Sequence, residues 1–405
     1  MKKIVSAILL AFAISLFMPV HPAQAYFMSG EQERQVGNVV IEEFEKIHNT
    51  WDDPYVDKIA EELVKYNPDA LNFDDGKHDR FLRYPKIMTG GVSMASETPG
   101  GQVYMHKELL DLVFSIPFDG KIHYTDQAPQ DGTNLYHRAM LGAVMSHEFS
   151  HWHNDDFRRK IHAFYSDEEL KNIVGQNMQF SSDGVYRLMM NIANSKEVHM
   201  KNADVSMDNE RKADLMGQKL LSHTQFMSPG SMVGFLRRME LNEAQESNNS
   251  SYSFEVNYNP HPETAERIQN AKKYLADLSH DRVTFKGDSF YLDGKPFMGT
   301  GKMQGRVDVA AEDRTYFLAG QIARAINEGT FHKGMVKLIP VSGSQKDFKE
   351  ATDCYMAFQT RAGKLFVADL LRLKKGEAAA IYAHENRANW SDDAKFFMTF
   401  ADSLS

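Results

Sequence analysis

The sequence predicts an α+β fold: a mainly α-helical domain that contains a small β-sheet, followed by a smaller α/β domain. Helix-capping signals precede the first two amphipathic segments, and short β-like stretches broken by glycine run from residue 81 to 105. After about residue 280 the helical pattern gives way to a hairpin-like segment and three apolar stretches of strand length. Helices and strands that occupy separate parts of the chain favour α+β over a repeating α/β pattern.

Two capped helices open the first domain. Ser29 followed three residues later by Gln32 forms a capping box, which predicts a helix to about Ile47. Asp53 precedes Pro54 in the way an N-cap precedes the first helical position. Apolar residues at helical spacing then predict a buried stripe on this second helix. The stripe comprises Val56, Ile59, Ala60, Leu63 and Val64.

Short strands follow, and the strand "GGQVYM" at residues 100–105 leaves two alternatives open. It is either an edge strand, along which an extended peptide could lie, or the interior strand of a small sheet. A helix is expected over residues 107–113, then a polar insertion at 118–133, and then a long helix from about Leu135 to Asp155.

Helices continue to about Leu278, interrupted by a loop rich in Asn and Ser at residues 243–259. The following segment predicts a hairpin that turns at Asp293-Gly294, and a helix over residues 310–328 that ends at Gly329. Three strands are expected in "MVKLIPV", "CYMAFQT" and "KLFVADLL", before a last capped helix from Ser391. The domains are therefore placed at residues 26–280 and 281–405.

The first 25 residues have the pattern of a secretory signal peptide. Lys2 and Lys3 precede an apolar stretch over residues 4–16, and Ala23-Gln24-Ala25 gives the small-x-small cleavage pattern. The stretch is shorter than the roughly 20 residues that span a bilayer, so we expect cleavage and no integral membrane segment afterwards. We therefore expect an exported protein, periplasmic or secreted. Its formal net charge of −9 argues against a nucleic-acid partner.

The pentapeptide "HEFSH" suggests a metal site in the helix over residues 135–155. His147 and His151 are four residues apart, so both rings project from one helix face and can share one ion. Imidazole pairs suit zinc, which in catalytic sites takes three protein ligands and leaves a fourth position open. Glu148 stands beside that position. His153 is two residues further on and should face another side of the helix.

A second acidic pair lies downstream in "NERKADLMG". Glu210 and Asp214 are again four residues apart, on a segment where Ala213, Leu215, Leu220 and Leu221 suggest a buried helix. Two carboxylates that face a core are costly unless they are paired or bind a metal. Glu210 would complete the ligand set, and Asp214 would accept a hydrogen bond from a ligand histidine and fix its tautomer. The alternative is an exposed face on which both acids lie beside Arg211 and Lys212.

The ordered motifs resemble the zinc metallopeptidase family of the HtpX heat-shock protease and the CAAX prenyl endopeptidases, its soluble exported branch above all. The matching segments are "SGEQERQVG", "DDPYVDKIAEELV", "GGVSMASETPGGQVYMHKELLDLV", "AVMSHEFSHWHNDD", "NERKADLMGQKLL" and "HPETAERI". Together they span roughly residues 29–275. The resemblance implies a zincin-type (gluzincin) domain. The family usually has glycine where this chain has Ser150, and residues after 280 fall outside the resemblance.

The resemblance also implies roles for individual residues. His147, His151 and Glu210 would bind one Zn²⁺ per chain, and Glu148 would be the general base. Asp214 would be the acidic partner, which is often assigned as a proton donor. His261 and Arg267 would lie near the metal, because members of the family carry a His-Pro followed by Arg-Ile there.

These residues predict a zinc-dependent endopeptidase. Zinc lowers the pKa of a bound water, Glu148 takes its proton, and the hydroxide attacks a peptide carbonyl. His261 or Arg267 would help stabilise the oxyanion. The expected partners are polypeptides, either unfolded or envelope proteins, with a role in envelope protein quality control. The alternative is a zinc-stabilised, latent chaperone or protein-binding module whose C-terminal domain recruits partners. A separate hypothesis, taken from the resemblance, is that His261 caps the zinc and holds the enzyme latent.

Overall fold

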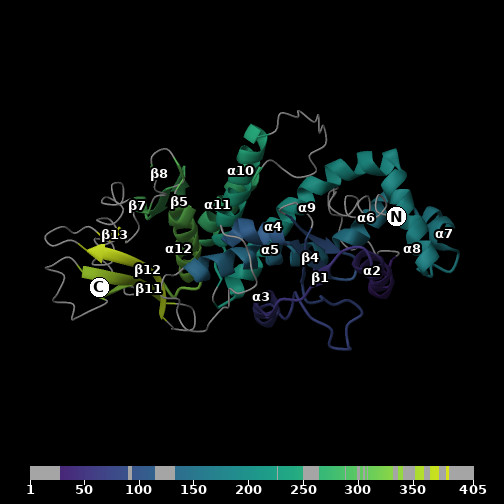
Figure 1. Ribbon diagram of the computed structural model, residues 1–405, viewed down its shortest axis with the longest axis horizontal. Helices are drawn as coiled ribbons and strands as arrows, with labels where there is room; N and C mark the ends of the chain where they lie inside the picture. Colours follow the sequence, from purple (N-terminus) through teal and green to yellow (C-terminus); the bar gives the residue numbers. More distant parts are fainter. Residues whose placement is uncertain are drawn as a thin grey trace. The chain divides into compact units, whose positions relative to one another are not determined.

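The computed structural model is shown in Figure 1. It describes residues 28–89, 94–114, 133–225, 227–249, 264–287, 289–298, 302–303, 306–307, 309–331, 336–340, 352–359, 365–373 and 380–382. The expected signal peptide, most of the 118–133 insertion, His261 and the helix from Ser391 lie outside these residues. Within the described ranges, no helix combines the length and the apolar character needed to cross a membrane.

The two opening helices begin where their caps predict. Helix α2 spans Gly30–Glu45, and the reciprocal capping box between Ser29 and Gln32 is present. Helix α3 spans Pro54–Tyr66, and the Asp53 side chain accepts hydrogen bonds from the first turn. The predicted stripe of α3 is buried except for Val64, which is half-buried. Each N-cap satisfies backbone N–H groups that have no partner within the helix.

A mixed four-stranded sheet follows, in the order β1-β2-β4-β3. Its strands are β1 (Thr50–Trp51), β2 (Lys86–Met88), β3 (Ala95–Thr98) and β4 (Gln102–His106). Strand β4 pairs with β2 in parallel and with β3 in antiparallel orientation. The stretch "GGQVYM" therefore supplies the interior strand, and the interior alternative is confirmed. The edge next to it is β3, which has β4 on one side and no other partner among the described strands.

Helices make up the rest of this region. They are α4 (Lys107–Phe114), α5 (Thr133–His153), α6 (Asp156–Phe164), α7 (Asp167–Val174), α8 (Ser182–Asn194), α9 (Lys196–His223), α10 (Ser231–Asn249) and α11 (Thr264–Leu278). An apolar core joins α2, α6, α7 and α8, and Figure 1 shows these helices close together. Helix α10 continues into the loop expected at residues 243–259, so the start of that segment is helical.

The described C-terminal residues contain the hairpin, the helix and the three strands that the sequence predicts. Strands β5 (Val283–Lys286), β6 (Ser289–Leu292) and β7 (Lys295–Met298) form an antiparallel sheet, and Asp293 and Gly294 both have positive φ in the turn. These angles are those of the tight hairpin turn that the Asp-Gly pair favours. A short pair, β8 (Lys302–Met303) and β9 (Arg306–Val307), precedes helix α12 (Val309–Asn327).

Strands β10 (Val336–Pro340), β11 (Thr352–Gln359), β12 (Leu365–Leu373) and β13 (Ala380–Tyr382) form an antiparallel meander. Three of the four were expected from the sequence. The fold is therefore α+β and mainly helical, as predicted.

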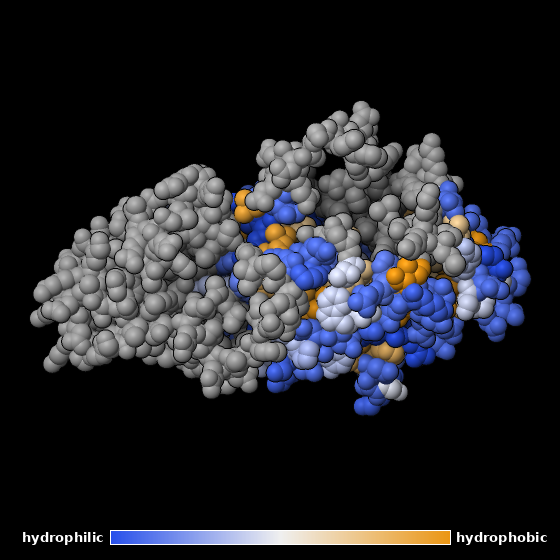
Figure 2. Space-filling model, in the orientation of Figure 1, coloured by the Kyte–Doolittle hydropathy of each residue, from blue (hydrophilic) through white to orange (hydrophobic). Residues whose placement is uncertain are grey.

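The chain divides into two compact units whose segments alternate along the sequence. The first takes the described residues up to Phe114, together with Val144–Leu220 and Arg238–Arg267. The second takes the described residues before Val144 in α5, Leu221–Arg237, and those from Ile268 onward. The proposed domain boundary at residue 280 stays a prediction. On the face shown in Figure 2, hydrophilic residues cover most of the described surface.

Candidate metal centre

Helix α5 carries the pentapeptide and is buried on nearly every side. The residues around its histidines, from Ala143 to Ser150, are all buried. A helix that is buried on nearly all sides lies in the protein interior, so its polar residues are held there as well. His147 and Glu148 are 7% and 8% exposed, so both polar side chains are withdrawn from bulk water. Ser150 stands where the family has glycine, and its Oγ donates to the carbonyl of Ser146 over 2.6 Å.

Helix α9 brings the second acidic pair to the same place. Glu210 and Asp214 are both 4% exposed, so they face the interior and not solvent. Of the apolar residues expected beside them, Leu220 and Leu221 are buried, but the prediction for Leu215 is wrong because this side chain is 43% exposed. Leu215 directly follows Asp214, about 100° around the helix, so it faces away from the side that holds both acids.

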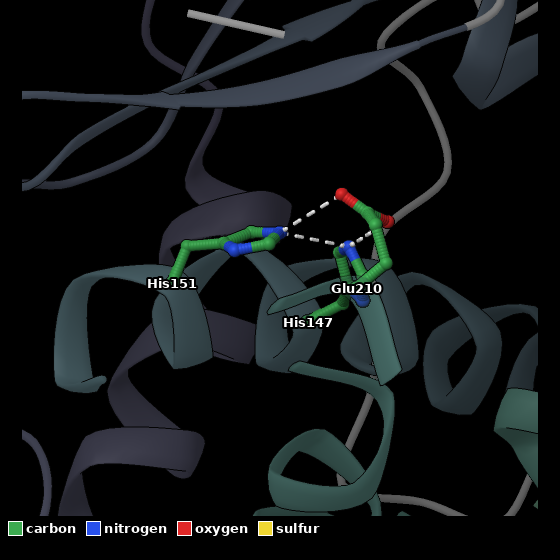
Figure 3. A group of neighbouring side chains, drawn as sticks. All are labelled: His147, His151 and Glu210. Carbon is green, nitrogen blue, oxygen red and sulfur yellow. Dashed lines mark hydrogen bonds and ion pairs between the residues drawn. The ribbon is translucent and has the colours of Figure 1, made fainter. Parts of the chain in front are cut away.

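The two imidazoles and the Glu210 carboxylate converge, as Figure 3 shows. The Nε2 atoms of His147 and His151 are 3.1 Å apart. Nε2 of His147 lies 3.3 Å from Oε2 of Glu210, and Nε2 of His151 lies 3.5 Å from Oε1 of Glu210. Ligands held at zinc's usual bond lengths in tetrahedral geometry are about 3.3–3.5 Å apart. The three side chains therefore fit one Zn²⁺, and among the described residues they form a His₂Glu set of three ligands.

Asp214 lies behind His147 and holds its ring. Its Oδ1 is 2.9 Å from Nδ1 of His147, which leaves Nε2 directed at Glu210. The Arg267 guanidinium donates to Asp214 through Nε and Nη2, each over 2.8 Å. Burial alone would raise the pKa of Asp214, but Arg267 and His147 hold it below its usual value. The lowered pKa favours the charged form of Asp214, which supports an orienting role, and its assignment as a proton donor stays a prediction.

The negative charge around His147 is strong enough to outweigh burial. Burial lowers the pKa of this ring, but the charges and hydrogen bonds of Glu210 and Asp214 raise it to about 10. A field that favours a proton on the imidazole also favours a divalent cation at the same position. Arg267 is buried as well, with Nη1 3.6 Å from Oε2 of Glu210, and its pKa is raised by the two carboxylates against the effect of burial.

His151 also has a carboxylate partner, which sequence reasoning did not identify. Nδ1 of His151 lies 2.7 Å from Oδ2 of Asp156. Each ligand imidazole thus has a buried aspartate on its Nδ1 side and the Glu210 carboxylate on its Nε2 side. This is the usual second-layer support of a metal-binding histidine.

Glu148 is held by the sheet and not by the metal cluster. Its Oε2 accepts a hydrogen bond from the backbone N–H of Glu97 in β3, over 2.9 Å. Its negative charge also favours the charged forms of two buried cations, Arg267 and Lys160. Glu148 is therefore a buried carboxylate that stands outside the group of three metal ligands, with its side chain bonded to the edge strand of the sheet.

The other candidate residues take different positions. His153 is outside the cluster, as predicted, and its Nδ1 lies 3.0 Å from the carbonyl of Ala70. It is half-buried and not fully exposed to solvent. Arg267 is close to the metal ligands, as the resemblance implies, but its hydrogen bonds go to Asp214. His261 lies outside the described residues.

A comparison with known protein families supports the interpretation of this cluster as the zinc site of a peptidase. Residues 93–275 match the model described as Peptidase family M48. The match runs from just before β3 to α11, so it includes His147, Glu148, His151, Glu210, Asp214 and Arg267. The resemblance to this zinc peptidase family is confirmed over that segment. No curated protein matches the chain.

Proposed function

Because residues 93–275 match peptidase family M48, whose members are zinc metallopeptidases, we propose that this protein is a zinc-dependent endopeptidase. The observation that carries the proposal is the convergence of His147, His151 and Glu210, with Glu148 outside the ligand set. A structural zinc site is closed by four protein ligands, whereas a catalytic site keeps one position open. Three ligands among the described residues, and a neighbouring carboxylate, fit the catalytic type.

The chain's own residues supply proton transfer and orientation. A bound Zn²⁺ would polarise a peptide carbonyl and make a water molecule more acidic. Glu148 is the residue that takes the water proton and later delivers it to the departing amine. The Glu97 N–H fixes one oxygen of that carboxylate, so the base is oriented before a substrate arrives.

Substrate binding is proposed along β3. This strand ends the sheet among the described residues, and the N–H of Glu97 faces away from β4 towards Glu148. An extended polypeptide laid along β3 would pair with the outward-facing backbone groups other than the Glu97 N–H, which Glu148 occupies, and would pass the base. Pairing at a sheet edge recognises backbone groups more than side chains, and this kind of recognition suits unfolded polypeptides. We propose unfolded or envelope proteins as substrates, and export to a periplasm or out of the cell.

The test compares zinc content with activity. The purified full chain should contain one zinc and cleave an unfolded protein such as casein. Glu148→Gln should keep the zinc and lose activity by at least about 100-fold, since it keeps the shape of the side chain but removes the base. Glu168→Gln, a change of the same kind at an exposed position on α7, should cleave like wild type.

Two results would contradict the proposal. Absence of bound zinc from the wild-type chain would remove the metal centre. A zinc-loaded wild type that binds unfolded protein without cleaving it, and does so equally well as Glu148→Gln, would favour the latent chaperone or binding module instead.

A further inference from the structure

The chain breaks its helix directly after the metal-binding segment. Helix α5 ends at His153 and α6 begins at Asp156. Between them, Asp155 adopts the left-handed conformation, with φ 59° and ψ 31°. In a continuous helix, a residue five positions after His151 would lie about 140° away around the axis and face elsewhere. The left-handed residue turns the chain, so that Asp156 comes back to the His151 ring.

Ion pairs hold this turn in place. The Asp155 carboxylate accepts from both Arg80 and Arg158. Arg80 also donates to the carbonyl of Trp152 over 2.7 Å, and its guanidinium lies over the Trp152 ring at 4.7 Å. The Glu33 carboxylate of α2 pairs with both arginines, at 2.7 Å from Arg80 and 3.3 Å from Arg158. A left-handed aspartate is tolerated at some cost, and this network of contacts offsets it.

The Asp156 side chain is almost fully buried, and each of its two carboxylate oxygens contacts a different partner. Its side chain is 3% exposed. Oδ2 lies 2.7 Å from Nδ1 of His151, and Oδ1 lies 3.3 Å from Nη1 of Arg159. Arg159 therefore compensates the carboxylate charge without competing for the oxygen that faces the imidazole. A buried carboxylate would be costly without such partners.

We propose that Asp156 is a positioning residue that fixes the ring orientation and the tautomer of His151. With Nδ1–H donated to Asp156, the lone pair of Nε2 is left facing Glu210 and His147, where the ion would bind. The turn at Asp155 is the structural device that brings this carboxylate into place. The inference rests on the proposed metal site, and it assigns to His151 the support that Asp214 gives to His147.

The experiment measures zinc affinity in the full chain by competition with a chromophoric chelator. Loss of a supporting carboxylate of this kind typically weakens metal binding by about 10- to 100-fold. We expect that loss for Asp156→Ala. Asp156→Asn keeps an oxygen that accepts from Nδ1–H and has nearly the same volume, so its loss should be smaller. Asp167→Asn, which removes an exposed charge from α7, is the matched control and should bind zinc like wild type.

A second readout separates positioning from a purely structural role. With Co²⁺ in place of zinc, the visible absorption spectrum reports the geometry of the ligands. It should change in Asp156→Ala and stay unchanged in the control. The melting temperature of the metal-free variants tells whether folding is intact, and Asp156→Asn serves if the alanine variant does not fold.

Distinct outcomes decide between the two proposals. If wild type binds no zinc, the metal centre and this inference both fail. If wild type binds zinc and cleaves substrate, but both Asp156 variants keep wild-type zinc affinity and cobalt spectrum, only the role of Asp156 is refuted. Weaker binding with the ordering wild type, Asn, Ala would establish it.

Discussion

The backbone N–H of Glu97 donates to Oε2 of Glu148 over 2.9 Å, which joins the edge strand β3 to the proposed general base. The Glu97 side chain has a separate environment. Burial and the charges of Glu33 and Glu148 raise the pKa of its carboxyl group well above its usual value, against the opposing effect of Arg80 and Lys160. Backbone and side chain of one residue therefore make different contributions, which substitutions can separate.

Glu97→Pro should lower kcat/KM by about 10-fold or more, because it removes the N–H that orients Glu148. The N–H faces away from β4, so the change removes no hydrogen bond between strands, and an edge strand tolerates proline in that position. Glu97→Ala keeps the N–H and is the control. Equal kcat/KM for the two variants, measured with intact zinc content, would contradict an orienting role for the backbone.

Arg267→Gln should destabilise the metal-free protein by about 3–5 kcal/mol, because it removes the buried guanidinium that pairs with Glu210 and Asp214 and leaves them only His147. Urea unfolding followed by circular dichroism measures this loss. Arg211→Gln provides the comparison, since Arg211 pairs with Glu266 at the surface and such pairs contribute about 0–1 kcal/mol. Similar losses of unfolding free energy in both variants would show that the buried ion pairs of Arg267 contribute no more than the surface pair of Arg211.

Asp57→Asn should raise the melting temperature at pH 7.5 and have no effect below about pH 4. Burial, with the nearby charges of Asp52, Asp53 and Glu61, raises the pKa of Asp57 to about 6. The folded state thus binds this proton more tightly than the unfolded state, so wild-type stability falls as pH rises from about 4 to 6. The Asp57→Asn variant has no carboxyl proton to lose at this position, so it does not lose stability over this pH range. A difference in melting temperature that is constant from pH 4 to 8 would refute the assignment.

Gly37→Ala should destabilise the protein by about 1–3 kcal/mol through overpacking. A Cβ on this α2 residue would lie 2.1 Å from the carbonyl oxygen of Pro99 and 2.7 Å from the Cα of Gly100, in the turn that joins β3 to β4. Gly234→Ala in α10 meets only ordinary contacts, the nearest at 3.6 Å, and should be neutral or slightly stabilising. Thermal unfolding of the two variants tests this prediction. A Gly37→Ala variant as stable as wild type would show that the turn between β3 and β4 moves to make room for the Cβ.

Local signals made the helices and the candidate metal ligands predictable from the sequence. The capping box at Ser29 and the Asp53-Pro54 start involve residues within one turn of each other, so the pattern contains the whole interaction. The same holds for His147 and His151, whose spacing fixes one helix face. Glu210 lies far along the chain and was found through its own pairing with Asp214 and through the family motif.

Contacts that depend on a chain reversal were not predictable. Asp156 is in the same segment as the ligand histidines, but helical spacing places it away from His151 unless Asp155 turns the chain. That reversal depends on Arg80 and Glu33, which are remote in sequence. Strand order is a similar case: the pattern of "GGQVYM" fits an edge or an interior strand, and only the pairing of β2 and β3 decides.

The outer border of the sheet at β3 has a consequence for self-association. Any strand with open backbone groups can recruit the same strand from another molecule, and long flat edges aggregate for this reason. Here the border is only four residues long, and the N–H of Glu97 near its centre already donates to Glu148. Two copies that met along it would therefore gain few hydrogen bonds. This edge strand is thus better suited to transient pairing with other polypeptides than to the growth of fibrils.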